Sequence, residues 1–120
     1  MRVGKRLVLA LACVLGLTGV AQADAVLTTP VLLVSSNTFM SCLISNVSDR
    51  KTTVRIEVIN FNGVTLDDSD EITLEAGQSD GRSGYETARC RFTVGNKNAV
   101  RALATVNDGG IGSTSSVEAR

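Results

Sequence analysis

Hydrophobic side chains recur at every second position through much of this chain, and that period excludes most other folds. Val54, Ile56 and Val58 alternate with polar neighbours, and residues 88–94 and 100–106 repeat the pattern. A period of two residues places side chains on the two faces of a β-strand in turn, whereas a helix has a period near 3.6. Since no stretch beyond residue 24 keeps a helical period, the sequence predicts an all-β fold.

Turn-forming residues separate the alternating segments. Residues 48–51 (SDRK) predict a turn, and Asn62-Gly63 and residues 95–98 (GNKN) each predict a hairpin. Residues 78–84 are predicted as a longer loop because they hold two glycines and two serines.

The two ends of the domain predict weaker strands. Pro30 interrupts an apolar segment at residues 25–34, which favours an edge strand or a bulge, and a weak strand is expected around residues 113–117. With these included, about seven short strands indicate a single antiparallel β-sandwich, and a small barrel is the alternative.

Residues 1–23 have the three parts of a secretory signal peptide. Arg2, Lys5 and Arg6 precede an apolar run at residues 7–20, and Ala21-Gln22-Ala23 is a cleavage site of the small-x-small type. The run is short for a membrane span. An uncleaved anchor and a lipoprotein acylated at Cys13 are alternatives. We therefore expect a leader at 1–23, a β-sandwich domain at 24–120, and export to the periplasm or the medium without a membrane span.

Cleavage after Ala23 changes the charge and the cysteine count. The leader carries three of the 12 basic residues and none of the 12 acidic ones, so the mature chain has a net charge of −3. Cys42 and Cys90 remain, and an even number of cysteines in an exported chain predicts a disulfide. Both lie on the inferred inner face of their strands, so the bridge is expected to join the two sheets.

The chain contains no His, which excludes Ser-His-Asp and Cys-His catalysis and His-bound zinc or copper. No other spacing singles out a catalytic set, so we expect a protein without enzyme activity or cofactor. Asp67, Asp68, Asp70 and Glu71 offer oxygens to Ca²⁺, but their spacing matches no calcium loop, and a solvated acidic loop is the simpler interpretation. Residues 46–48 (NVS) fit the N-glycosylation pattern, which often occurs by chance.

Four arginines are predicted to point outward: Arg55, Arg89, Arg91 and Arg101. They converge on one face if the third, sixth and seventh strands share a sheet, as in immunoglobulin-like topology. Guanidinium groups bind phosphates and carboxylates, so this face predicts an anionic envelope glycan or an acidic protein as partner. Neutralisation by Glu57, Glu86 and solvent is the alternative. Nucleic acid is not expected, because the mature chain is acidic and has few aromatic residues for base stacking.

Four stretches between Cys42 and Cys90 carry a resemblance: residues 46–48, residues 53–59, Asn62-Gly63 and residues 74–79 (LEAGQS). They resemble bacterial immunoglobulin-like sandwiches and small exported proteins of uncharacterised function, where the last stretch is similar to a Leu-x-Pro-Gly-x-Ser loop. Ala76 stands in place of the Pro, the core Trp of antibody-type domains is missing, and Ala88 stands where their Tyr would be. The resemblance covers about half of the mature chain and implies a fold, not an activity.

These observations predict an exported, disulfide-bonded β-sandwich that acts as a non-catalytic binding module through its arginine face. The alternative is a structural or assembly subunit of the cell envelope, joined to its neighbours through exposed sheet edges.

Overall fold

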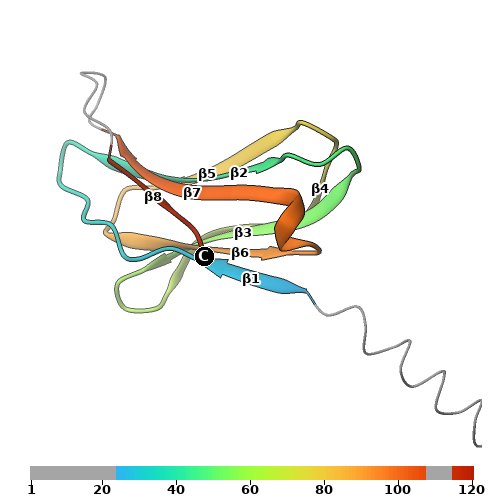
Figure 1. The fold of residues 1–120 in the computed structure, drawn as a ribbon. Coiled ribbons are helices and arrows are strands. Elements are labelled where there is room, and N and C mark those ends of the chain that lie inside the picture. The colour runs from blue at the N-terminus through green and yellow to red at the C-terminus, as the bar shows by residue number, and fades with distance from the viewer. Residues whose placement is uncertain (1–23, 108–114) are drawn as a thin grey trace, which may run out of the picture.

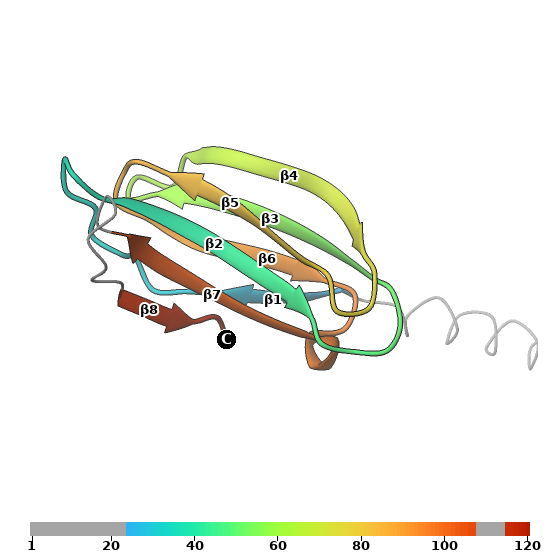
Figure 2. The ribbon, with the colours of Figure 1, turned by 90° about the horizontal axis from the view of Figure 1, so that it is seen from above.

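The computed structural model describes residues 24–107 and 115–120, and they form two four-stranded antiparallel sheets packed face to face (Figures 1 and 2). The sheet that we call the β3 sheet has the strand order β1-β6-β3-β4, and the β2 sheet has the order β5-β2-β7-β8. The strands are β1 (Ala25–Thr28), β2 (Phe39–Asn46), β3 (Thr52–Asn60), β4 (Thr65–Leu74), β5 (Ser79–Gly84), β6 (Ala88–Val94), β7 (Val100–Asn107) and β8 (Ser115–Glu118). The all-β sandwich class is confirmed.

The alternating segments form the core, as their period predicts. On β3, Val54, Ile56 and Val58 are each at most 1% exposed. They lie opposite Val94, Phe92 and Cys90 of β6 in the antiparallel register, so the inward residues of adjacent strands form continuous rows. Aliphatic residues make up most of this core, and Phe92 is its one fully buried aromatic side chain among the described residues.

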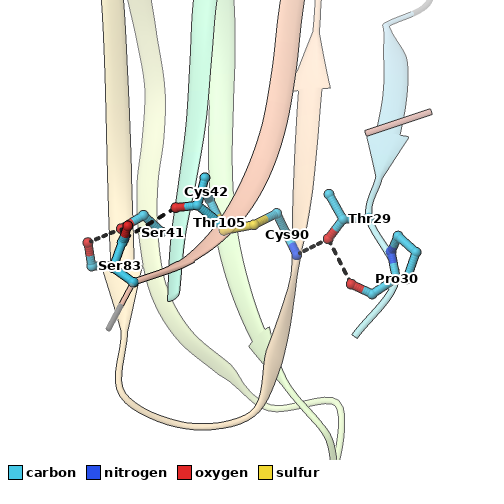
Figure 3. Close-up of a disulfide and its surroundings, with 8 residues drawn as sticks. Thr29, Pro30, Ser41, Cys42, Ser83, Cys90 and Thr105 are labelled. Carbon is cyan, nitrogen blue, oxygen red and sulfur yellow. Dashed lines mark hydrogen bonds between the residues drawn. A yellow bond between two sulfur atoms is a disulfide. The ribbon is translucent and has the colours of Figure 1, made fainter. Parts of the chain in front are cut away.

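The predicted disulfide joins Cys42 of β2 to Cys90 of β6 and so links the two sheets through the core. Both cysteines are 0% exposed, and their Cα atoms are 5.6 Å apart, a usual separation for a disulfide. Thr29, just beyond β1, lies beside this bridge (Figure 3). Its Oγ1 accepts the N–H of Cys90 at 3.0 Å, and its own N–H donates to the Cys90 carbonyl at 3.1 Å.

The prediction of a loop at residues 78–84 is wrong, because Ser79–Gly84 is strand β5 at the edge of the β2 sheet. Its six residues pair with β2, so backbone hydrogen bonding rather than an apolar face defines the strand. Gly81 lies against Leu43 of β2: a Cβ at this position would lie 2.6 Å from Cδ2 of Leu43, so that side chain would have to move.

The two predicted hairpins have different outcomes. Asn62-Gly63 connects β3 to β4, which pair antiparallel, and Gly63 has the positive φ of 84° that this turn favours. Residues 95–98 do not form a hairpin. They lead into a 3₁₀ turn, η1 (Lys97–Ala99), and the chain crosses from the β3 sheet to the β2 sheet, where β7 pairs with β2.

Both terminal strands lie at sheet edges. β1 ends at Thr28, before Pro30, at the edge of the β3 sheet, and β8 is the edge strand of the β2 sheet. Backbone hydrogen bonds between Thr28 and Arg120 join the ends of these two strands at 2.9 and 3.0 Å. The predicted leader at 1–23, with Cys13, lies outside the described residues. Within residues 24–107 and 115–120, no helix has the length and apolar character needed to span a membrane.

Candidate functional site

The four arginines singled out from the sequence do not share one face. Arg55 on β3 and Arg89 and Arg91 on β6 occupy outward positions of the β3 sheet. Arg101 lies near the start of β7, and β7 belongs to the other sheet. The expected convergence is therefore wrong for Arg101, because the chain crosses between sheets after β6 instead of turning back beside it.

Arg91 is paired with Glu57 on the neighbouring strand. Its Nε donates to Oε1 at 3.1 Å and its Nη2 to Oε2 at 2.8 Å, which gives a two-bonded ion pair. Glu57 is only 6% exposed, so its carboxylate needs this partner to be tolerated there. These hydrogen bonds raise the pKa of Arg91.

Arg55 is paired with Asp68 on β4 in the same manner. Its Nε donates to Oδ1 at 3.0 Å and its Nη2 to Oδ2 at 2.5 Å. Hydrogen bonding from Arg55, together with the N–H of Asp70, lowers the pKa of Asp68 from 3.8 to about 2. Two of the three arginines on the β3 sheet are thus balanced by carboxylates of the same face.

The acidic cluster is part of strand β4 and not a loop, which corrects the prediction made from its composition. Between Arg55 and Glu57, strand β4 has one residue more than β3, so the pairing register shifts at this point. Asp70, in this stretch of β4, has a positive φ of 56°. Such an interruption is a β-bulge. The Oγ of Ser69 accepts the N–H of Ile56 at 2.8 Å, which replaces the lost backbone partner. No group of three acidic or Cys side chains among the described residues is arranged to hold a metal ion.

Arg89 and Arg101 make no ion pair within residues 24–107 and 115–120. Arg101 donates from Nη1 to the backbone carbonyl of Val100 at 2.8 Å. The two residues lie on different sheets, so each offers a single guanidinium group to its surroundings. The arrangement brings together less free positive charge than the sequence suggested.

Two of the four edge strands, β4 and β5, carry features that discourage strand addition. β4 has two register shifts and a run of acidic residues. On β5, Asp80 and Arg82 occupy the inward register positions opposite Ile44 and Cys42. Bulges and inward charges are common ways in which proteins protect an edge from pairing with another chain. These features oppose assembly through β4 or β5.

Sequence analysis missed a group of exposed hydrophobic side chains at one end of the sandwich, which we call the apolar end. It consists of three loops, at residues 29–38, 61–64 and 85–87, on the left of Figure 1. Hydrogen bonds to Thr87 hold the loops together, from the N–H of Phe61 at 3.2 Å and the N–H of Val34 at 3.0 Å. Five large hydrophobic residues are exposed here, with exposed fractions from 38% to 83%: Val31, Leu33, Phe61, Val64 and Tyr85.

The three described loops of the apolar end carry one charged residue, Glu86. Tyr85 packs against Phe39 at the start of β2, with ring centroids 6.0 Å apart. The signal that could have revealed this end is the placement of Phe61 and Val64 on either side of Asn62-Gly63, where turns usually carry polar residues.

The opposite end, which we call the polar end, consists of the loops at residues 47–51, 75–78 and 95–99. Asn46, the last residue of β2, is 1% exposed and holds this end together. Its Nδ2 donates to the carbonyls of Arg50, Leu74 and Glu75 at 2.7 to 3.2 Å, and its Oδ1 accepts the N–H and the hydroxyl of Ser48. Since its amide is buried and fully bonded, Asn46 is not available as a glycan acceptor in the folded protein.

No family model matches the sequence, and no curated protein matches it. Among solved structures, the crystal structure of Thermotoga maritima 1070 is similar, with a TM-score of 0.54 and 12% sequence identity over 82% of this chain and 91% of that one. At this identity the similarity supports the fold alone.

Proposed function

We propose that this protein is an exported, non-catalytic binding module that engages its partner through the apolar end. The observation that carries the proposal is the distribution of exposed hydrophobic residues: five of the eight among the described residues lie on these three loops. Scattered exposed hydrophobic residues are ordinary, whereas a contiguous group is typical of an interaction site. Loops held by a rigid sandwich are also where binding residues are usually found.

The lack of His supports a non-catalytic role, and so does the pairing of carboxylates with arginines. The best-placed carboxylates, Glu57 and Asp68, are engaged by Arg91 and Arg55. Asp68, whose pKa is lowered to about 2 by Arg55, is a poor proton carrier near neutral pH. The disulfide is compatible with an oxidising compartment, as an exported protein requires.

The arginine face is a weaker candidate than the sequence suggested, because its ion pairs leave little net charge to attract an anionic partner. Arg89 and Arg101 carry what remains, and they lie on separate sheets. An anionic partner would need to contact both sheets to use them together.

Cell fractionation of two double variants separates these possibilities. We expect Leu33→Ser with Phe61→Ser to move the protein from the envelope fraction to the soluble fraction, because it removes two side chains that are 83% and 75% exposed. Arg89→Ser with Arg101→Ser should leave the distribution between the two fractions unchanged. A high-salt wash of the envelope should release little of the unmodified protein, because salt screens charge interactions but not apolar contacts.

The opposite pattern would contradict the proposal. Retention of the Leu33→Ser and Phe61→Ser protein in the envelope, with release of the arginine variant by salt, would return the function to the arginine face. The melting temperature of each variant provides the control, because exposed positions are expected to change stability by no more than about 0.5 kcal/mol.

A further inference from the structure

We infer that the apolar end docks on the interfacial region of a lipid bilayer, with Leu33, Phe61 and Tyr85 entering the boundary between headgroups and acyl chains. The inference rests on the proposed function and names its partner. It is argued from the shape of this end, from its backbone hydrogen bonds and from its charge.

The exposed hydrophobic residues lie on three different loops. None of them lines the four surface pockets described for residues 24–107 and 115–120, although one of these pockets reaches Thr29 and Pro30 of the loop at residues 29–38. Strong contacts between proteins usually seat a side chain in a well-packed pocket. A fluid bilayer surface needs no such complementarity, since lipids rearrange around separate tips, and it therefore fits this end better than a protein partner does.

The turn at residues 61–64 is exposed, yet each of its backbone N–H groups is bonded within the protein. Phe61 donates to the carbonyl of Thr87 at 3.2 Å, and Gly63 donates to the carbonyl of Asn60 at 3.0 Å. The N–H groups of Asn62 and Val64 both donate to Oδ1 of Asn60, at 3.0 and 2.9 Å. An unpaired N–H is costly to remove from water. The turn can therefore leave water without stranding a backbone N–H group.

The neighbouring loop at residues 29–38 is partly organised in the same way. Leu32 exchanges backbone hydrogen bonds with Ala88 at 2.8 and 3.2 Å, and the N–H of Ser35 donates to Oγ1 of Thr38 at 2.8 Å. Leu33 extends from this bonded frame with 83% of its side chain exposed.

The charge of the apolar end indicates which lipids it requires. Among the described residues, Glu86 is the one charged residue in its three loops, and the basic loop residues Arg50, Lys51 and Lys97 lie at the polar end. Surfaces that recognise anionic lipids carry clusters of Lys and Arg. The apolar end lacks such a cluster and carries a Tyr, whose amphipathic ring suits the headgroup level. We therefore expect docking on neutral lipid, with little dependence on lipid charge.

Tyr85 provides a built-in probe, because the chain has one Tyr and no Trp. The protein is purified as cells export it and mixed with phosphatidylcholine vesicles. We expect the vesicles to shield Tyr85 fluorescence from acrylamide, and the protein to float with them in a density gradient. Adding anionic lipid should lower the partition coefficient by no more than about fivefold, because the three described loops carry the single acidic charge of Glu86.

Matched variants assign the binding to the apolar end while keeping Tyr85 as the probe. Leu33→Ser with Phe61→Ser should weaken partitioning by about tenfold or more, since interfacial binding scales with buried apolar area. Val26→Ser with Val47→Ser is the control. These two residues are 55% and 54% exposed but lie away from the apolar end, on β1 and in the polar end, and their replacement should leave partitioning unchanged. A retained leader or lipid would float every variant equally and would not shield Tyr85.

The other possible results bear either on the lipid inference alone or on the proposed function as well. Equal losses in both double variants, or flotation without shielding of Tyr85, would overturn the lipid inference. If vesicles do not bind but Leu33→Ser with Phe61→Ser still releases the protein from cell envelopes, the partner is a protein and the proposed function stands. If that variant also stays in the envelope, the proposed function fails as well.

Discussion

The two ends of the sandwich are built around the same residue type but use it differently. At the polar end, the buried Asn46 bonds to the loops that follow β2 and β4, which tie the two sheets together. At the apolar end, the half-buried Asn60 bonds to a single turn and leaves Phe61 and Val64 exposed on it. The comparison indicates that the polar end contributes more to stability, while the apolar end holds exposed hydrophobic side chains on a turn that few other contacts depend on.

The disulfide lies between the two ends, so its removal should affect both. We expect Cys42→Ala with Cys90→Ala to lower the free energy of unfolding by about 4 kcal/mol, by releasing a long loop in the unfolded chain and by leaving a cavity in the core. Chemical denaturation measures the loss, and hydrogen exchange should show faster opening at both ends. A variant that opens at one end alone would show that the ends are independent of the central bridge.

Asn46→Ala should produce the next largest effect. Because the change leaves the buried carbonyl of Leu74 without its side-chain donor and removes the bonds to the carbonyls of Arg50 and Glu75, we expect a loss of about 3 kcal/mol, measured by urea denaturation. Asn46→Asp is the sharper control, since it keeps the shape and acceptors but loses the Nδ2 donor, and it should be at least as damaging. A loss below about 0.5 kcal/mol would remove the stabilising role given to the polar end.

Asn60→Ala should cost less than Asn46→Ala, about 1 kcal/mol, because the Asn60 side chain accepts hydrogen bonds from one solvent-exposed turn. Hydrogen exchange should accelerate at Asn62 and Val64 and stay unchanged at the polar end. If the two asparagine variants were equally unstable, the contrast between the ends would not hold.

The smallest expected effect concerns the ion pair between Arg55 and Asp68, which lies between the ends on the β3 sheet. Because the folded-state pKa of Asp68 is lowered to about 2, its contribution to stability is present above about pH 4 and is lost as the pH falls toward 2. Asp68→Asn should therefore make the melting temperature slightly less dependent on pH in this range. An identical acid profile for the two proteins would show that the pair is fully screened by solvent.

The sequence predicted the strands whose hydrophobic alternation lies within the strand itself. Alternation assigned the inward faces of β3, β6 and β7, and the phase of Cys42 and Cys90 correctly predicted a bridge between sheets. These features depend on side chains a few residues apart, which a linear pattern records directly.

The features that sequence analysis missed depend on partners distant in the chain. Residues 79–84 form a strand because β2 offers a free edge, not because their side chains favour one. Arg101 lies apart from Arg55 because β7 pairs with β2 instead of β6. The apolar end was missed because residues 25–34 were predicted as one edge strand or bulge, while the structure places residues 29–38 in a loop that meets the turn at residues 61–64 and the loop at residues 85–87.

The burial of Asn46 has a consequence for producing the protein in other cells. An N-linked sugar would be attached to Nδ2 of Asn46, and this atom is bonded to three carbonyls inside the fold. A sugar could therefore be attached at residues 46–48 only before β2 pairs with its neighbours. In a secretory pathway that attaches sugars to nascent chains, each molecule modified at Asn46 would carry a bulky group where the fold leaves no space. Folding and glycosylation are thus mutually exclusive outcomes at this site, and the yield of native protein would depend on which is faster.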